Sequence, residues 1–186
     1  MSSKYWAILT ICMILPFVAF GDGEEDEPNK KVAPSIEAGI ALGGLYSNHS
    51  FTNKPLKTMH LVANIPFTDQ VFYGIGTGFE KGPDIHVLPF YLMFKGMFDD
   101  QGNTPYITSR VGYAVSWSDK NKYLKEYEIS GGMLFAAGAG YRYRLGNTTS
   151  FLIEVGYHHQ FLVERVNDYE TDLNLDMISL KAGVLF

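Results

Sequence analysis

The chain has 186 residues with 20 acidic and 15 basic side chains, which give a formal net charge of −5. This mildly acidic balance, with no basic run longer than Lys30-Lys31, argues against a nucleic-acid partner. Aromatic residues make up 15% of the chain and glycines number 19, a mixture that favours short strands and tight turns over helices. The one cysteine, Cys12, lies in the N-terminal segment, so we expect neither disulfides nor thiol catalysis in the mature protein.

Residues 1–21 have the pattern of a secretory signal peptide. Lys4 provides the positively charged N-terminal region, and residues 5–20 are uncharged and mostly apolar. Small residues precede a predicted cleavage site after Gly21. The alternative, a retained membrane helix, needs roughly 20 apolar residues, more than this segment offers. Residues 22–34 crowd acidic side chains together, and we expect a disordered acidic leader there.

From residue 35 the hydrophobic pattern has a period of two, which predicts strands. Each predicted strand has at least the roughly 9–11 residues that a tilted strand needs to cross a bilayer. Connections at 68–69 and 145–148 are short, whereas those at 48–55, 119–130 and 165–172 are longer and polar, as in periplasmic turns and outer loops. Pro89 cannot donate a ladder hydrogen bond, so we expect a bulge or a strand start near it. The predicted strands are 35–47, 56–67, 70–80, 85–98, 105–118, 131–144, 150–164 and 173–186.

The two faces of these strands differ in character. One is continuously apolar and aromatic, and the other carries glycine, alanine, serine and the charges. A soluble ligand-binding barrel of eight strands would place its apolar face inside, whereas a membrane barrel places it outside. With the signal peptide, the pattern predicts an all-β protein whose residues 35–186 form an eight-stranded antiparallel up-and-down transmembrane β-barrel. The charges on the second face are Glu37, Lys95, Arg110, Arg142, Arg144, Glu154 and Lys181.

Three segments carry a family resemblance: Leu180-x-Ala182-x-Val184 before the terminal Phe186, Gly138-x-Gly140-Tyr141-Arg142-Tyr143, and Val155-Gly156-Tyr157. With them, the chain resembles the small outer-membrane β-barrel family of Gram-negative bacteria, akin to OmpX and the transmembrane domain of OmpA. The resemblance covers residues 35–186 and implies a place in the cell outer membrane. It also implies that the outer-membrane assembly machinery recognises the C-terminal strand, with Phe186 as the matching terminal aromatic residue.

Eight strands enclose a space that side chains nearly fill, so inward-facing charges must find partners. We expect Glu37 and Glu154 to lie close to Lys181, where the barrel closes. We expect Arg142 to reach Glu154, with Arg110 one strand further on. The resulting hypothesis is an ion-pair network that plugs the lumen, and the alternative is a small gated pore lined by the same residues.

The histidines do not form a catalytic pattern. His158 and His159 are expected on opposite faces of their strand, so they cannot share a metal, and the His-x-Ser-Asn signature of lipid A deacylase barrels is absent after His159. His49 beside Ser50 lacks a third partner, and His60 and His86 are also expected to lack partners. We therefore expect no catalytic residue, no cofactor and no metal, and a lipid A-modifying enzyme is the less favoured alternative.

The expected role is structural, in envelope integrity or surface contact, for a monomer in contact with outer-membrane lipid and lipopolysaccharide. Residues 118–130 mix both signs of charge with aromatic side chains, and such a loop can extend the sheet beyond the membrane and offer a strand edge to another protein. Residues 164–172 are acidic, and their carboxylates can share divalent cations with the phosphates of lipopolysaccharide.

Overall fold

The computed structural model describes residues 36–47, 55–99, 103–118, 127–146, 148–166 and 169–186. The predicted signal peptide with its cleavage site at Gly21, the acidic leader and His49 with Ser50 lie outside these residues. Within the described ranges, no helix has the length and apolar character needed to span a membrane.

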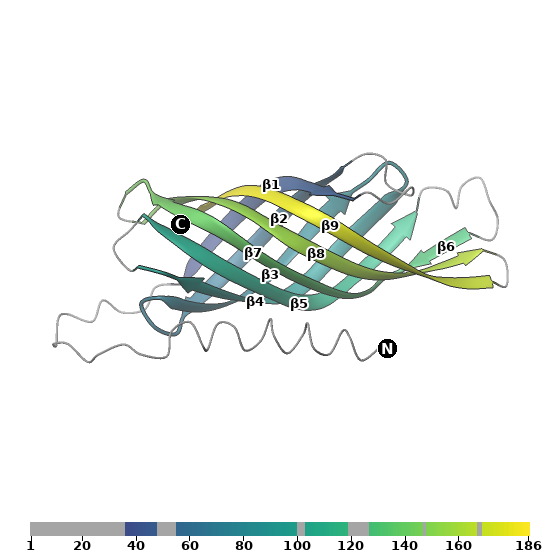
Figure 1. The fold of residues 1–186 in the computed structure, drawn as a ribbon, viewed down its shortest axis with the longest axis horizontal. Coiled ribbons are helices and arrows are strands. Elements are labelled where there is room, and N and C mark those ends of the chain that lie inside the picture. The colour runs from purple at the N-terminus through teal and green to yellow at the C-terminus, as the bar shows by residue number, and fades with distance from the viewer. Residues whose placement is uncertain (1–35, 48–54, 100–102, 119–126, 147, 167–168) are drawn as a thin grey trace.

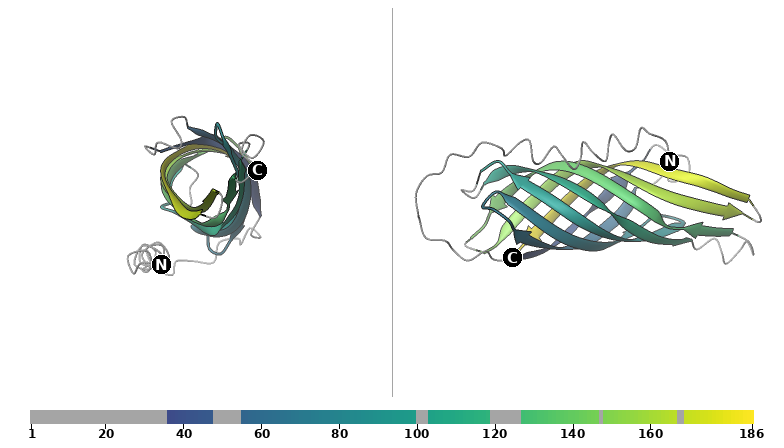
Figure 2. Two further views of the ribbon diagram at one scale, coloured as in Figure 1. Left: turned by 90° about the vertical axis from the view of Figure 1, so that its right-hand side faces the viewer. Right: turned by 90° about the horizontal axis from the view of Figure 1, so that it is seen from below.

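Eight long antiparallel strands form a closed barrel, seen along its axis in Figure 2. Each strand pairs with its neighbour in the chain, except that β5 pairs with β7, and β9 returns to pair with both β8 and β1. The short β6 adds to β8 beyond the barrel wall (Figure 1). The all-β, eight-stranded fold expected from the sequence is therefore confirmed. The strands are β1 (Glu37–Tyr46), β2 (Leu56–Pro66), β3 (Val71–Lys81), β4 (Ile85–Met97), β5 (Thr104–Ser118), β6 (Tyr127–Ser130), β7 (Gly132–Arg144), β8 (Ser150–Val166) and β9 (Tyr169–Leu185).

The seam between the first and last long strands closes the barrel. Residues Gly39 to Tyr46 of β1 pair with Leu185 to Ile178 of β9 in antiparallel register. Beyond the ladder, Ala38 and the terminal Phe186 exchange two backbone hydrogen bonds of 3.1 and 2.8 Å. The last residue of the chain thus takes part in closure, and a closed barrel leaves no unpaired edge within the bilayer.

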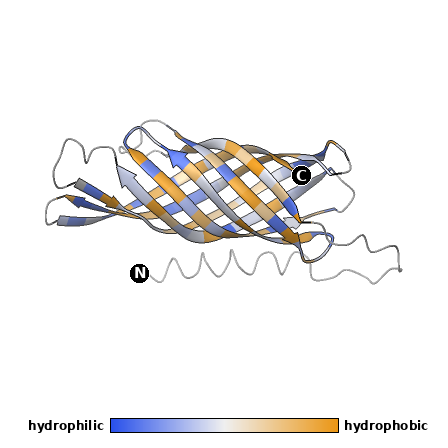
Figure 3. Ribbon diagram, turned by 180° about the vertical axis from the view of Figure 1, so that it is seen from behind, coloured by the Kyte–Doolittle hydropathy of each residue, from blue (hydrophilic) through white to orange (hydrophobic). Residues whose placement is uncertain are grey.

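The exposed side chains of the barrel wall are largely apolar, and Figure 3 shows that apolar and polar residues alternate along the strands. On β9 the outward positions stay apolar from Ile178 to Phe186, a length that matches the roughly 9–11 residues a tilted strand needs to cross a bilayer. A surface this apolar is unfavourable in water but favourable against acyl chains, so the barrel spans a membrane. Exposed aromatic residues gather toward the two ends, with Tyr46, Phe79 and Trp117 at one and Tyr73, Phe98, Tyr141, Tyr143 and Phe186 at the other.

The two ends of the barrel differ in their connections. The end with the chain termini of the barrel carries the short turns 67–70 and 145–149, and the opposite end carries the loop from β1 to β2 and the extended tips of β8 and β9. Short turns face the periplasm in such barrels, so we term the first end periplasmic and the second end outer.

At the outer end the observed structure differs from what the sequence predicted. Residues 165–172 were expected to be a loop, but β8 runs to Val166 and β9 starts at Tyr169, with ladder pairs up to the tip. The new strand β6 lies inside the predicted loop 119–130. Above the membrane both faces of a strand can be polar, so the period-two signal fades there although the backbone ladder continues.

The expected bulge at Pro89 does not form. The β3–β4 ladder stops at Thr77↔Phe90 and resumes at Glu80↔Val87 in the same register, so no residue is inserted. Pro89 has no N–H to donate, and the Thr77 hydroxyl instead donates a 3.0 Å hydrogen bond to the Pro89 carbonyl. The consequence is a short gap in the ladder of an otherwise regular wall.

Candidate functional site: the barrel lumen

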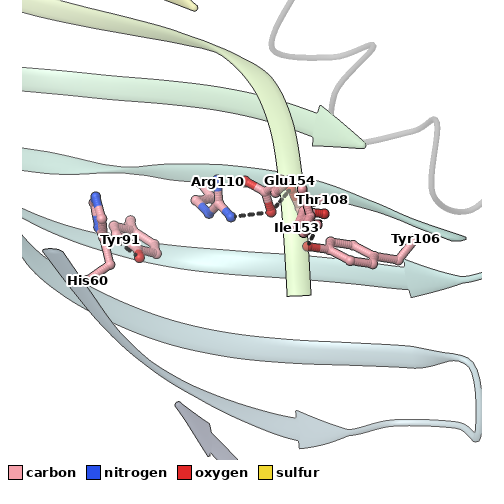
Figure 4. A network of polar contacts seen from close by, with 7 residues as sticks. All are labelled: His60, Tyr91, Tyr106, Thr108, Arg110, Ile153 and Glu154. Carbon is pink, nitrogen blue, oxygen red and sulfur yellow. Dashed lines mark hydrogen bonds and ion pairs between the residues drawn. The ribbon is translucent and has the colours of Figure 1, made fainter. Parts of the chain in front are cut away.

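The centre of the lumen holds a buried ion pair between β5 and β8 (Figure 4). Arg110 Nη2 lies 2.7 Å from Glu154 Oε2, and the Thr108 hydroxyl donates to the same oxygen at 3.2 Å. The two side chains cross over β7, where Gly138 leaves room: a Cβ at that position would lie 3.3 Å from Glu154 Cγ and from Thr108 Oγ1. Both charged side chains are more than nine-tenths buried, so each depends on the other for compensation.

A second ionic group lies toward the periplasmic end. Glu37 accepts from Arg142 at 2.7 Å and lies 3.6 Å from Lys95 Nζ. Arg142 Nε also donates to the Ser150 hydroxyl at 2.9 Å, which fixes the guanidinium plane. The Lys95 ammonium lies 5.9 Å from the centre of the Tyr106 ring, within the range of a cation–π contact. The Glu37 carboxylate therefore compensates two cations, Arg142 and Lys95.

A third polar group lies toward the outer end. His60 Nε2 is 3.5 Å from Glu80 Oε1, and the Tyr91 hydroxyl is 3.2 Å from His60 Nδ1. All three side chains are buried, and the glycines of β3 provide their space. A Cβ on Gly76 would lie 2.4 Å from the Tyr91 ring, and one on Gly78 would lie 2.5 Å from His60 Nδ1.

The sequence interpretation missed this third group. Glu80 ends the predicted strand 70–80 and was not counted among the inward charges, whereas it lies inside β3 and is fully buried. His60 was expected to lack a partner and has two. His86 was also expected to lack one, but its ring stacks on Trp117 at 5.5 Å on the outer surface. The sequence feature that could have indicated this group is the Gly-x-Gly-x-Gly pattern at 74–78, because a strand face made of glycines accommodates large side chains from the neighbouring strands.

The expected partners of the lumen charges need correction. Arg142 was expected to reach Glu154 but pairs with Glu37, and Glu154 pairs with Arg110 instead. Lys181 is the register neighbour of Glu154, yet within the described residues it forms no ion pair with Glu154 or Glu37. Strands are tilted and staggered in a barrel, so inward side chains meet across strands that are not sequence neighbours.

Arg144 departs from its expected place on the charged inner face. The side chain is exposed at the periplasmic end of β7, and its backbone N–H donates to Asn103 Oδ1 at 2.8 Å. The strand reaches water at this point, so an arginine head group at its end needs no partner inside the lumen.

Two apolar clusters enclose the ionic groups along the barrel axis. The inner face was expected to carry only small and charged residues, but its outer part is filled by buried leucine, isoleucine, valine and methionine side chains. A smaller cluster of Phe72, Met97 and Tyr106, with Leu152 packed against it, lies at the periplasmic end. The outer cluster includes Leu45, Leu56, Ile85, Val87, Ala114, Ile129, Leu134, Leu162, Leu173, Leu175 and Met177, with Tyr91 and Met93 at its inner side.

A separate polar cluster lies on the outside of the wall. His159 Nδ1 is 2.6 Å from Asp176 Oδ1, and the Tyr157 hydroxyl donates to the same oxygen. The His159 ring lies edge-on to Phe161, with 4.4 Å between ring centres. Asp176 is the first charged outward position beyond the apolar run 178–186, so the cluster lies at the outer boundary of the membrane band.

The protruding hairpin carries charge pairs typical of a solvated surface. Arg165 of β8 contacts Glu170 of β9 and lies 3.6 Å from Glu128 of β6. The hydrogen bond to the Glu170 carboxylate raises the pKa of Arg165, so this side chain stays charged. Across the described segments, no set of three His, Cys, Asp or Glu side chains is placed to hold a metal ion.

The closed eight-stranded wall, the apolar band and the aromatic ends together define an outer-membrane β-barrel protein. Among solved structures, similar folds include Neisserial surface protein A (NspA), with a TM-score of 0.61 and 16% identity over 81% of this chain and 94% of NspA. The outer membrane protein OprG from Pseudomonas aeruginosa gives a TM-score of 0.54 and 13% identity over 81% and 94%.

A major outer membrane protein from Thermus thermophilus gives a TM-score of 0.50 and 11% identity over 82% of this chain and 99% of that one. No protein-family profile matches the chain, and no curated protein sequence matches it. At such low identities the likeness establishes the fold alone, and the fold is that of the small outer-membrane barrels expected from the sequence.

Proposed function

We propose that this protein is a closed, non-conducting and non-enzymatic barrel that supports the outer membrane and presents a surface for contact with other molecules. The single observation that carries the proposal is the layered lumen, in which ion pairs lie between two apolar clusters.

The physical reason is the cost of moving an ion past the outer cluster. Leu45, Leu175 and Met177 are at most 2% exposed, so the side chains there leave no path for water. An ion stripped of water in apolar surroundings is unfavourable by many kcal/mol. The ion pairs below hold opposite strands together but offer a passing ion no continuous polar route.

The surface-contact role rests on the protruding tips of β8 and β9. Within the described part of the chain, β1 pairs with β9 only up to Ile178, and residues 169–175 of β9 have a ladder partner on the β8 side alone. Such an edge offers unpaired N–H and C=O groups to an added strand. We propose that an extended segment of a surface partner pairs there.

Planar bilayer recording tests the closed lumen. The refolded mature protein is expected to show no discrete conductance steps, and Lys181→Ala and Arg142→Ala are expected to remain silent. A matched variant with Leu45, Leu175 and Met177 all changed to serine removes the outer cluster and is expected to pass ions. Discrete steps in the wild type that change with Lys181→Ala or Arg142→Ala would instead favour a small gated pore.

The proposed environment is outer-membrane lipid and lipopolysaccharide around a monomer. We further propose that the assembly machinery recognises β9 through Phe186, which closes the seam with Ala38. Deletion of Phe186 is expected to reduce the fraction of heat-modifiable, folded protein in outer-membrane preparations. Phe98→Ala, at an equally exposed periplasmic aromatic residue, is the control and is expected to leave that fraction unchanged.

A second candidate, a lipid A-modifying enzyme, is favoured by the contact between His159 and Asp176. A carboxylate that holds a histidine in place is the usual arrangement for a general base. Its position at the outer boundary would meet the head-group region of lipid A. The test is the mass of lipid A from cells that express the protein: an altered mass that is lost in His159→Ala but kept in His86→Ala would establish this activity and overturn the non-enzymatic role.

A further inference from the structure

A small cavity lies in the lumen between the central and periplasmic ionic groups. Its volume is about 40 Å³, and the polar side chains that line it are Asn64, Lys95, Tyr106, Thr108, Arg110, Glu154 and Lys181. A polar site of about 10–15 Å³ is enough for one water molecule, so this cavity has room for a monatomic ion with some water.

The charges around this cavity do not balance. Three cations line it, Lys95, Arg110 and Lys181, against the single carboxylate of Glu154. The nearest additional carboxylate, Glu37, is shared by Lys95 with Arg142. With Arg142 and the buried Glu80 of the outer polar group included, four cations face three carboxylates among the described lumen residues, which leaves one positive charge in excess.

Lys181 is the cation with the weakest compensation. The charged groups that act on it are Arg110, Glu154 and Glu80, but Glu154 is paired with Arg110 at 2.7 Å, and among the described residues no ion pair joins Lys181 to Glu80. Its side chain is 5% exposed, and Gly43 on the facing strand leaves space for its stem, since a Cβ there would lie 2.9 Å from Lys181 Cγ. A buried charge without a close partner is strongly destabilising.

Asn64 provides an independent sign of a missing ligand. The residue is fully buried, and neither Nδ2 nor Oδ1 of its amide has a hydrogen-bond partner. Gly74 on the adjacent strand makes room for this amide, because a Cβ there would lie 2.6 Å from Asn64 Oδ1. Buried amides are rarely left without partners unless they contact a water molecule or a bound group.

We propose that this cavity binds one monovalent, chloride-sized anion, held by the Lys181 and Lys95 ammonium groups and the Asn64 amide N–H. The anion balances the excess positive charge and supplies the hydrogen-bond acceptor that Asn64 Nδ2 lacks. Because apolar clusters close both ends of the lumen, the anion is taken up as the barrel closes and is released when it unfolds. This binding site is independent of the surface-contact role.

Two measurements on the refolded mature barrel test the site. Crystals grown in sodium bromide are expected to show an anomalous bromide peak in the cavity near Lys181 Nζ and Asn64 Nδ2. Urea unfolding in detergent is expected to depend on chloride: above the dissociation constant, each tenfold rise in chloride raises the folded-to-unfolded ratio about tenfold. Sodium gluconate at the same ionic strength controls for screening and is expected to have no such effect.

Variants separate the site from general salt effects. Lys181→Met is expected to remove both the bromide peak and the chloride dependence, whereas Lys81→Met, at an exposed position on the outer rim, keeps both. Glu154→Gln adds one uncompensated positive charge, so it is expected to bind the anion more tightly and to show the chloride dependence from lower chloride concentrations than the wild type. The proposal is overturned if no bromide peak lies in the cavity, or if chloride and gluconate give the same unfolding midpoint in the wild type.

Discussion

The outer part of the lumen and its centre are both filled, but different interactions fill them. At the outer end Leu45 and Leu175 are fully buried among other apolar side chains and need no specific partner. At the centre the side chains of Arg110 and Glu154 are 9% and 6% exposed, and each is compensated by the other at 2.7 Å. Apolar side chains of the outer cluster can therefore be exchanged for others of similar size, whereas each charged side chain at the centre needs its particular partner.

The energetics of the two regions follow from this contrast. Full burial of a leucine side chain stabilises the folded state by about 1.5–3 kcal/mol. A buried ion pair contributes little net stability compared with well-packed apolar residues, because both ions lose their water. We therefore assign most of the lumen's contribution to stability to the apolar clusters, and the choice of strand register to the ion pairs.

Removal of one ion-pair partner is expected to have the largest effect. Arg110→Met leaves Glu154 buried without its cation and is expected to lower the free energy of unfolding by about 4 kcal/mol. Urea unfolding in detergent measures this change, with the fluorescence of Trp117 as a probe, because it is the one tryptophan after residue 21.

The double variant Arg110→Met with Glu154→Leu sharpens the same point. It removes both charges together, and we expect it to recover most of the stability lost in the single variant. A double variant as unstable as Arg110→Met alone would mean that the loss comes from packing around position 110 and not from the unpaired carboxylate.

Truncation in the outer cluster is expected to have the next largest effect. Leu175→Ala removes a fully buried side chain and leaves a cavity, so we expect a loss of about 3 kcal/mol in the same unfolding experiment. Leu180→Ala is the matched control on the same strand, where the side chain is 51% exposed to lipid. Acyl chains can fill the space left there, so its loss is expected to be much smaller. Equal losses at both positions would contradict the assigned orientation of β9.

The smallest effect is expected outside the membrane. Arg165→Met breaks the contacts of Arg165 with Glu170 and Glu128 on the protruding hairpin, where all three side chains are at least half exposed. Such surface pairs contribute little because water and salt screen them. We expect no measurable shift in the urea midpoint at physiological salt, and a clear shift would show that the protruding hairpin is coupled to the barrel.

The sequence predicted the wall of the barrel well because the membrane imposes a strict rule on it. Most outward positions between the aromatic ends are apolar, and this requirement produces a clear period of two along strands such as β7 and β8. Predicted and observed strand limits agree within two residues except at the outer end of β9, which begins at Tyr169 and not at residue 173. There the strand leaves the bilayer, and the pattern that identified it disappears.

The candidate site was only partly predictable. The pattern identified Glu37, Arg110, Arg142, Glu154 and Lys181 as facing one side, but their partners depend on strand tilt and stagger, which a single sequence does not specify. The apolar outer cluster was missed because inward leucines such as Leu175 look the same as lipid-facing ones in a list of residues. The inward direction of Leu175 can be recognised only from its polar neighbours in the strand, Asn174 and Asp176, which face the other side.

The gap in the ladder between β3 and β4 has a mechanical consequence. Around Pro89 the ladder has no backbone pairs between Thr77↔Phe90 and Glu80↔Val87, although the two strands are paired on both sides of this gap. The hydroxyl of Thr77 bridges the gap by a hydrogen bond to the Pro89 carbonyl. When lateral tension pulls these two strands apart, the load at this point falls on fewer backbone hydrogen bonds than above or below it. The interface between β3 and β4 would therefore begin to open at Pro89.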